Sequence, residues 1–326
     1  MGAMEEPIGV VMATIANAVG VHPEMLRIFI TMAGAVFLAI EFHRGKSDGV
    51  PISAAIGWLL TGLSVYLMAE KYVEIQDPVL VVMTALCLPA GIGLAYMELK
   101  GGSRVDETLV WLRGAVAWSV IPYFLVYSVP TLNMAFVEMT GTITIWWLEA
   151  SGAGTYTLGP MMVDLAEGGH ILTSDWDGNR VILTEPLGEG GFYLPMLDGA
   201  GRPVSIGFIL SCSALQSMIV FVGAIVALSG VSWKRKARGL FISIPTIFVL
   251  NAFRNAGIVW LHVSYPDWRW LGLDIFDFAH SYAAKVASLG AMFVMALALF
   301  GLLPELHAHV MRIIEAPFGR RGSPGA

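Results

Sequence analysis

The sequence predicts an all-α polytopic membrane protein: a bundle of seven or eight transmembrane helices with a small extracytoplasmic β-hairpin loop. Three observations predict this class. Residues of the set AVILMFWYC make up 56% of the 326-residue chain, charged residues make up only 13%, and the mean hydropathy is +0.70. Soluble domains carry about 25% charged residues. The composition is therefore that of a chain embedded in lipid.

Apolar runs of roughly 18–25 residues have the length of a helix that crosses a bilayer. Seven such runs are expected to span, at 24–41, 51–69, 77–97, 108–128, 204–231, 240–264 and 278–303. The shorter run 7–21 is either an eighth span or an interfacial segment. The stretch 130–148 is interrupted by Glu138 and ends in two tryptophans, which predicts an interfacial helix or a short re-entrant segment.

Basic residues are distributed unevenly between alternate loops. Eleven lie in the segments 42–50, 98–107, 232–239 and 304–326. Four lie in the segments 70–76, 129–203 and 265–277. By the positive-inside rule this pattern predicts a cytoplasmic C-terminus and an extracytoplasmic loop at 149–203. Within that loop, Asp177-Gly178 separates two strand-like runs, which predicts a β-hairpin at this dipeptide.

Charge and cysteine content argue against several other classes. A net charge of −6 does not favour a nucleic-acid partner. The two cysteines, Cys87 and Cys212, both fall in apolar runs, so no disulfide framework is expected. The N-terminus carries Glu5 and Glu6 without a basic region, unlike a typical cleavable signal peptide. Closely spaced metal ligands and a phosphate-binding glycine loop are not evident, so neither a metal nor another cofactor is expected.

Cys212 is the first of three candidate catalytic residues. It falls eight residues into the run 204–231, with Gln216 one helical turn later and Ser217 beside that position. A cysteine in a membrane helix is more often a small apolar filler than a nucleophile. The polar side chains that would accompany this thiol are what favour the functional interpretation.

Arg254 is the second candidate. It shares one helical face with Asn251 and Asn255, at the spacing i, i+3 and i+4. An arginine at the centre of a membrane helix costs about 2.5–3.5 kcal/mol on insertion scales, so it must face the bundle interior or water. It is either a structural cation bound to carbonyl groups or a fixed positive charge beside the thiol.

His280 is the third candidate. It lies at the start of the run 278–303, with Asp277 three residues before it and Lys285 a little over one turn after it. An interfacial histidine exposed to water is the alternative interpretation. In a site, His280 would exchange protons with the thiol and with the amines that leave or attack, and Asp277 would orient the ring. In the predicted topology all three candidates fall in the outer half of the membrane.

Three stretches resemble the exosortase and archaeosortase family of membrane transpeptidases, and its archaeosortase branch most. They are SCSALQS at 211–217, NAFRNAGIV at 251–259 and AHSYAAKVASL at 279–289, in this order. The resemblance covers roughly residues 165–300. It implies one membrane-embedded transpeptidase domain over 1–326, with an extracytoplasmic loop at 149–203 and catalytic helices at 204–303.

The resemblance also implies an activity and partners. Members of the family recognise exported proteins by a C-terminal sorting signal, which here would be a Pro-Gly-Phe type motif, an apolar helix and a basic tail. They remove the helix and transfer the protein to a membrane phospholipid. The family's cysteine and arginine fall on Cys212 and Arg254. Its third position falls on His280, with Lys285 as the alternative. The site would face the extracytoplasmic side.

Two rival functions remain open at this stage. An intramembrane cysteine protease would use the same residues but resolve the thioester with water. A non-enzymatic transporter would line its pathway with Arg254 and His280. Transporter folds often contain internal repeats, and the sequence shows none.

Overall fold

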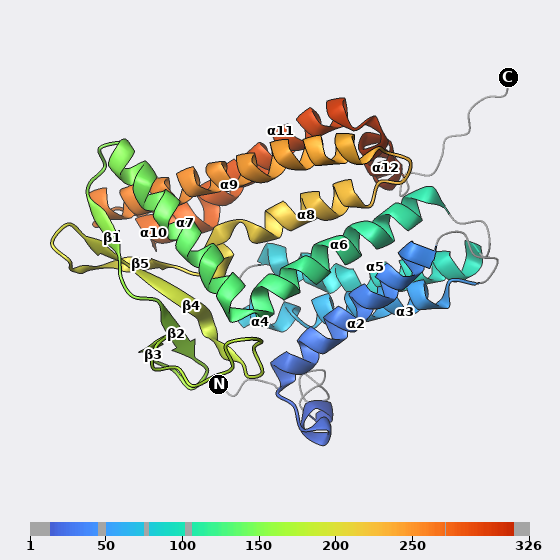
Figure 1. Ribbon diagram of the computed structural model, residues 1–326, viewed down its shortest axis with the longest axis horizontal. Coiled ribbons are helices and arrows are strands. Elements are labelled where there is room, and N and C mark those ends of the chain that lie inside the picture. Colours follow the sequence, from blue (N-terminus) through green and yellow to red (C-terminus); the bar gives the residue numbers. More distant parts are fainter. Residues whose placement is uncertain (1–13, 45–49, 75–77, 102–105, 271, 316–326) are drawn as a thin grey trace. The chain divides into compact units, whose positions relative to one another are not determined.

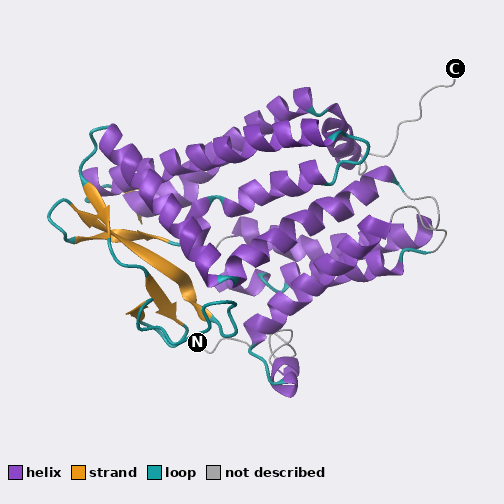
Figure 2. Cartoon of the chain, in the orientation of Figure 1, coloured by secondary structure: helices purple, strands orange, loops and turns teal. Residues whose placement is uncertain are grey.

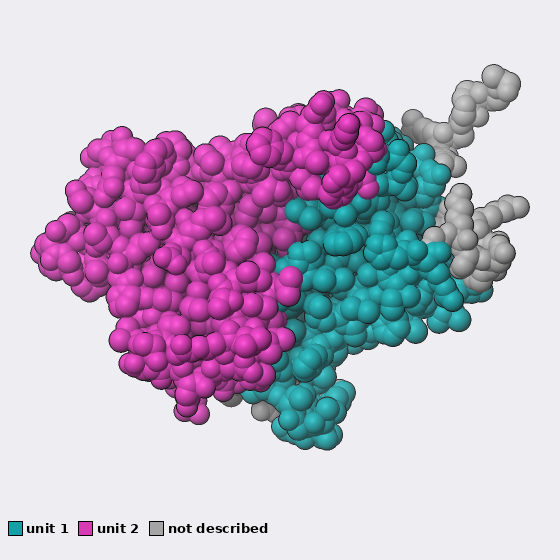
Figure 3. Space-filling view, in the orientation of Figure 1, with its two compact units in different colours: residues 1–124, 222–231, 305–326 teal, residues 125–221, 232–304 magenta. Residues whose placement is uncertain are grey.

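The computed structural model describes residues 14–44, 50–74, 78–101, 106–270 and 272–315. It contains two compact units, which Figure 3 shows in different colours. Unit 1 comprises residues 1–124, 222–231 and 305–326, and unit 2 comprises 125–221 and 232–304. Each unit is described by itself.

Unit 1 is helical (Figure 2). Its helices are α2 (Pro23–Arg44), α3 (Ile52–Tyr66), α4 (Ala69–Glu74), α5 (Pro78–Gly101), most of α6 (Glu107–Ser128), the end of α8 (Leu215–Val226) and α12 (Pro304–Glu315). Glycine allows α3 and α5 to approach closely, because a Cβ added at Gly62 would lie 2.7 Å from the Cys87 carbonyl oxygen. Leu38, Trp58 and Leu109 belong to the buried core of this unit.

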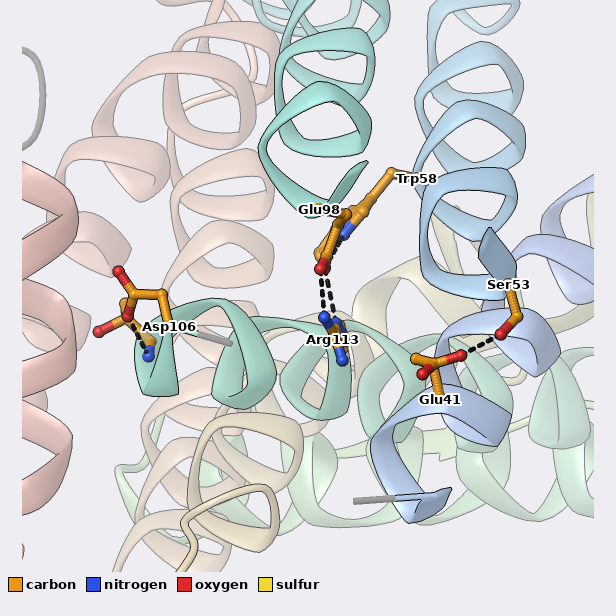
Figure 4. A network of polar contacts seen from close by, with 7 residues as sticks. Glu41, Ser53, Trp58, Glu98, Asp106 and Arg113 are labelled. Atoms are coloured by element: carbon orange, nitrogen blue, oxygen red, sulfur yellow. Dashed lines mark hydrogen bonds and ion pairs between the residues drawn. The ribbon is translucent and has the colours of Figure 1, made fainter. Parts of the chain in front are cut away.

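A polar network lies inside unit 1 (Figure 4). Glu98 on α5 and Arg113 on α6 form a buried ion pair, and the Trp58 indole N–H donates to Glu98 Oε1 at 3.0 Å. The Arg113 side chain is only 1% exposed. A buried charge is tolerated when its hydrogen-bonding groups have partners, and both members of this pair have them. Nearby, the Ser53 hydroxyl donates to the carboxylate of Glu41.

Unit 2 combines long helices with an antiparallel sheet (Figure 1). Its helical elements are α7 (Pro130–Ala150), the 3-10 turn η1 (Leu210–Ser213), the start of α8, α9 (Trp233–Ser264), α10 (Ile275–Phe278), the π-helical turn η2 (Ala279–Ala283) and α11 (Ala284–Leu302). Its larger sheet contains β1 (Tyr156–Leu158), β2 (Met162–Leu165), β3 (His170–Leu172), β4 (Leu187–Asp198) and β5 (Pro203–Phe208). A small hairpin joins β6 (Arg269–Trp270) to β7 (Leu273–Asp274).

The 12-residue strand β4 organises the sheet. Its neighbours are β1, β2 and β5, all antiparallel, and β3 extends the sheet beyond β2. One face of this arrangement packs on α7, with Val137, Leu194, Met196 and Phe208 in a common buried cluster. The sheet therefore rests on a helix, and β5 leads directly from it into the turn that carries Cys212.

The predicted hairpin at Asp177-Gly178 is wrong, although the segment does contain β structure. Residues 173–186 form turns and irregular structure instead of two paired strands. The Arg180 guanidinium donates to the carbonyls of Thr173 and Ser174, and Asn179 Oδ1 accepts from two following backbone amides, so side chains close this loop. The hairpin forms at Asp198-Gly199, between β4 and β5. There Gly201 supplies a φ of +76°.

Five of the seven expected spans coincide with helices that are long and apolar enough to cross a membrane. Among the described residues these are Pro23–Arg44, Leu80–Gly101, Glu107–Ser128, Trp233–Ser264 and Ile275–Leu302. The run 51–69 contains the shorter apolar helix α3. The stretch 130–148 forms the continuous helix α7. Of the run 7–21, residues 7–13 lie outside the described residues, and 14–19 are helical.

The expected single helix over 204–231 is wrong. This run forms strand β5, turn η1 and the 12-residue helix α8 in succession. Its first residues alternate in burial, with Ile206 and Phe208 buried and Ser205 exposed, as a strand with one covered face requires. Pairing of β5 with β4 gives these backbone groups partners that a helix start would lack. The N-terminal part of the run therefore forms an edge strand paired with β4 instead of a helix.

Candidate active site on the turn after β5

Cys212 lies on the 3-10 turn η1. The turn is closed by the Cys212 N–H donating to the Ile209 carbonyl at 2.9 Å and by the Ser213 hydroxyl donating to the Leu210 carbonyl at 2.7 Å. The thiol is partly buried against the cluster that joins α7 to the sheet. Ser211, the residue before it, places its hydroxyl within hydrogen-bonding reach of the sulfur. The thiol is therefore presented by a turn and not by the middle of a helix.

Ala214 separates this turn from α8. Its φ is +57°, and it is the one non-glycine residue with a positive φ in the described part of the chain. The left-handed conformation costs an alanine about 1–2 kcal/mol. Such strain is found preferentially at functional sites. The left-handed residue also interrupts the helix that was expected to place Gln216 one turn after Cys212. Gln216 is exposed in the first turn of α8 and does not share a helical face with the thiol.

Two asparagines of α9 hold the backbone of the cysteine turn. The side-chain amides of Asn251 and Asn255 both donate to the Cys212 carbonyl oxygen, at 2.6 Å and 2.9 Å. Residues four apart lie on one face of a helix, so α9 presents both amides to the same acceptor. The two asparagines of the predicted polar face therefore contact the protein's own backbone. We call this arrangement the asparagine clamp.

Arg254 lies on the same helix, beside the asparagine clamp. Its Nη1 lies 3.3 Å from Asn255 Oδ1 and donates to it. Its Nε is buried and has no hydrogen-bond acceptor among the described residues. The guanidinium lies close enough to the Cys212 thiol and to His280 for charge interactions with both. Arg254 is therefore within electrostatic range of both other candidate residues.

His280 lies on the π-helical turn η2, before α11. Its ring is exposed and stacks on Phe276, with centroids 5.5 Å apart and planes inclined by 5°. Asp277 and Lys285 are near enough for charge interactions with it. Among the described residues, no ion pair or hydrogen bond joins Asp277 to the ring; the Asp277 N–H instead donates to Asp274, which caps α10. Phe276 thus positions the imidazole, a role that the sequence did not indicate.

An open cavity of about 350 Å³ borders the site within unit 2. Ser217, Asn251, Arg254 and Ser288 are the polar residues of a lining that is otherwise apolar and comes from the start of α8, α9, η2 and α11. The Ser217 hydroxyl contacts the sulfur of Met292 at 3.6 Å. Lys285 is exposed on α11 and does not line this cavity. Of the predicted supporting residues, Ser217 and Asn251 therefore reach the cavity.

Unit 2 thus holds a thiol, a guanidinium and an imidazole, which are the groups that nucleophilic catalysis at sulfur uses. Within the described residues, no group of three or more His, Cys, Asp or Glu side chains is placed to hold a metal ion. Ser211 and Phe276 are the two site residues that the sequence did not single out. The alternation of polar and apolar residues in VSIGF, at 204–208, is the local signal that predicts a strand leading into the cysteine turn.

The chain is similar to Archaeosortase A of Haloferax volcanii, with 25% identity over 228 residues. The match covers 67% of this chain and 63% of that protein, so it spans a little under two thirds of the relative's length. No family model matches the chain, and no solved structure matches it. The similarity relates the chain to the archaeosortase and exosortase family, as the three stretches predicted. Together with the long apolar helices, it identifies a multi-pass helical membrane protein.

Proposed function

We propose that this protein is a membrane cysteine transpeptidase. It cleaves a C-terminal sorting signal of the Pro-Gly-Phe type from exported proteins and transfers them to a phospholipid. The observation that carries this proposal is the asparagine clamp: two amides fix the Cys212 carbonyl on the helix that also supplies Arg254. Holding a nucleophile and a cation in one rigid geometry lowers the entropic cost of reaction. The relation to an archaeosortase supports the class of chemistry.

The first half of the reaction forms a thioester. The Cys212 sulfur, as thiolate, attacks the carbonyl carbon of the scissile peptide bond and gives a tetrahedral intermediate. Arg254 stabilises negative charge on the sulfur before attack and on the oxygen afterwards. Collapse of the intermediate breaks the C–N bond. The departing amine takes a proton from His280, and the apolar tail with its basic end is released.

The second half transfers the acyl group. An amine of a phospholipid headgroup attacks the thioester carbon, and His280 accepts the proton that the amine loses. The sulfur leaves as thiolate, which regenerates the site beside Arg254. Lys285 is the alternative to His280 for proton transfer, because it lies in charge contact with the same ring. We place the site on the extracytoplasmic side, where exported proteins emerge.

Replacement of the nucleophile tests this proposal. Cys212→Ala is expected to lower the rate of processing by about a thousandfold or more, since a covalent step cannot proceed without its nucleophile. The reporter is an exported protein ending in a Pro-Gly-Phe motif, an apolar segment and a basic tail, and its shortening is measured in membranes. Cys87→Ala is the matched control, because Cys87 lies on α5 in unit 1 and its sulfur donates to the Met83 carbonyl of the same helix.

The mass of the product separates transfer from hydrolysis. Transfer adds a lipid to the new C-terminus, whereas water leaves a free carboxylate. A Cys212→Ala variant that is folded and still shortens the reporter would rule out the thioester route.

A further inference from the structure

The cavity beside the site is an elongated slot between two long helices. Its lining on α9 runs from Ile247 to Leu261, and on η2 and α11 from Ala279 to Met295. At a rise of 1.5 Å per residue these stretches are about 21 Å and 24 Å long. The hydrocarbon core of a bilayer is about 30 Å thick. The slot therefore follows two candidate membrane helices over most of that distance.

One wall of the slot is made of small side chains. Ala279, Ala283, Ala287 and Ala291 recur at intervals of four residues, which places them on one helical face. Ala283 and Ala287 are exposed. In a membrane, small residues at this spacing let a second helix approach the backbone closely. The wall is thus shaped to accept large apolar side chains.

Polar groups gather near the middle of the slot. Arg254 lies seven residues from both Ile247 and Leu261, so about 10 Å of lining extends along α9 on each side of it. Its guanidinium has one acceptor, Asn255, while its Nε has none among the described residues. An occupant that completes this site supplies a hydrogen-bond acceptor at mid-length and apolar groups on both sides.

These requirements distinguish a peptide from a lipid. A phospholipid carries its polar atoms at one end, and its acyl chains supply no acceptor along their length. A peptide supplies a carbonyl at every residue. In a regular α-helix those carbonyls are already bonded within the helix, so a peptide offers one to Arg254 only where it unwinds. Unwinding at this level also frees the peptide bond for attack from the cysteine turn, which is held to Asn251 and Asn255.

We propose that this slot binds the sorting signal of the protein substrate, with the apolar segment helical along the alanine wall and the preceding Pro-Gly-Phe motif unwound beside Arg254. The inference rests on the proposed function and adds the place where that substrate is held. Ala283, Ala287 and Ala291 then determine specificity, because they set how much side-chain volume the segment can place against α11. Arg254 has two roles: it binds the unwound carbonyl and stabilises the charge that develops there.

Filling the slot tests the inference. Ala287→Leu is expected to slow shortening of the reporter by about tenfold or more, because a misplacement of about 1 Å costs that much in an oriented reaction. Leu289→Phe is the matched control on the same helix: Leu289 lies on the opposite face, is 68% exposed and does not line the slot. We expect its rate to stay within about twofold of the parent. Equal rates for Ala287→Leu and the parent would overturn the inference.

Cross-linking identifies the occupant. In a Cys87→Ala, Cys212→Ala background, Ala287→Cys or Leu289→Cys supplies the only thiol of the chain. A reporter with single cysteines along its apolar segment is expected to cross-link to position 287 at every fourth residue or so and not to position 289, which lies on the opposite face of the helix. A phospholipid with a photoreactive acyl chain that labels position 287, unaffected by the reporter, would show a lipid site and overturn the inference.

The two proposals fail differently. If Cys212→Ala removes processing while Ala287→Leu and the cross-links show no effect, the transpeptidase proposal stands and the slot is not the binding site. If Cys212→Ala still processes the reporter, the catalytic proposal falls, whatever happens at position 287.

Discussion

Each unit contains an arginine within a long apolar helix, and the two arginines have opposite surroundings. In unit 1, Arg113 is 1% exposed, and its Nε donates to Glu98 Oε1 at 2.6 Å within a closed ion pair (Figure 4). In unit 2, Arg254 borders an open slot, donates to Asn255 and keeps a buried Nε without an acceptor in the described part of the chain. A cation in an apolar helix is therefore not by itself a sign of function. Its hydrogen-bond partners distinguish a structural arginine from one that is available to a ligand.

Substituting each arginine gives the largest expected contrast. Arg254→Met is expected to lower processing by about a hundredfold or more, because it removes the positive charge at the reacting atoms. The free energy of unfolding should change little, since no carboxylate is paired with Arg254 in the described residues. Processing of the reporter and thermal unfolding in detergent measure the two effects. A variant that processes normally would show that Arg254 is structural.

Arg113→Met is the reciprocal change. It leaves the Glu98 carboxylate buried without its cation, which costs about 3–5 kcal/mol. Adding Glu98→Leu to Arg113→Met should recover most of that stability, because an apolar pair of similar volume replaces the ion pair. Thermal unfolding of the single and double variants checks this result. A stable single variant would mean that the pair contributes nothing to unit 1.

The asparagine clamp gives the next effect in size. Asn251→Leu removes the 2.6 Å hydrogen bond to the Cys212 carbonyl and leaves the 2.9 Å bond from Asn255. We expect processing to fall by about tenfold, as the turn loses half of its support. Asn251→Leu with Asn255→Leu should cost more than the product of the single effects, because the two amides share one acceptor. If the fold-loss of processing in the double variant equals the product of the two single fold-losses, the two amides do not act together.

Glycine substitutions compare packing in the two units. A Cβ at Gly62 would meet the Cys87 carbonyl oxygen at 2.7 Å and the Gly91 Cα at 3.2 Å, so Gly62→Ala forces α3 and α5 apart. Overpacking of this kind costs about 1–3 kcal/mol. Gly290→Ala on α11 meets nothing within 4 Å and should be neutral or slightly stabilising. Thermal unfolding of both variants measures the difference, and equal values would show that α3 and α5 are not closely packed in solution.

The smallest expected effect is a pH dependence at α12. His309 hydrogen-bonds Thr108 and stacks on Trp111 at 5.1 Å, and burial, followed by the charge of Arg312, lowers its pKa despite Glu107 and Asp106. Because the folded pKa is lower than the unfolded one, acid favours protonation of the unfolded state. Protection of the α12 amides from hydrogen exchange should be constant above about pH 6.5 and fall below it.

His309→Gln is expected to flatten this dependence, with His307→Gln, at an exposed position of the same helix, as the control. A profile that His309→Gln leaves unchanged would assign the acid sensitivity to other groups.

The sequence by itself determined the membrane class and the polar face of α9. Both can be read from local sequence. The apolar composition indicates a chain embedded in lipid. The helical period places Asn251, Arg254 and Asn255 on one face wherever this segment is helical. The chemistry of a thiol, a guanidinium and an imidazole could be inferred for the same reason, since each residue type carries its reactivity with it.

Only the tertiary structure decided how Cys212 is presented and which arginine is available to a ligand. The run 204–231 is apolar enough for a helix, but β5 pairs with β4 in a hairpin, and this pairing turns the start of the run into a strand and leaves Cys212 on a turn. Likewise, Asp198-Gly199 forms the hairpin that was expected at Asp177-Gly178, because strands are available on both of its sides. Pairing partners far along the chain, such as Glu98 for Arg113, are set by packing, and local sequence does not encode them.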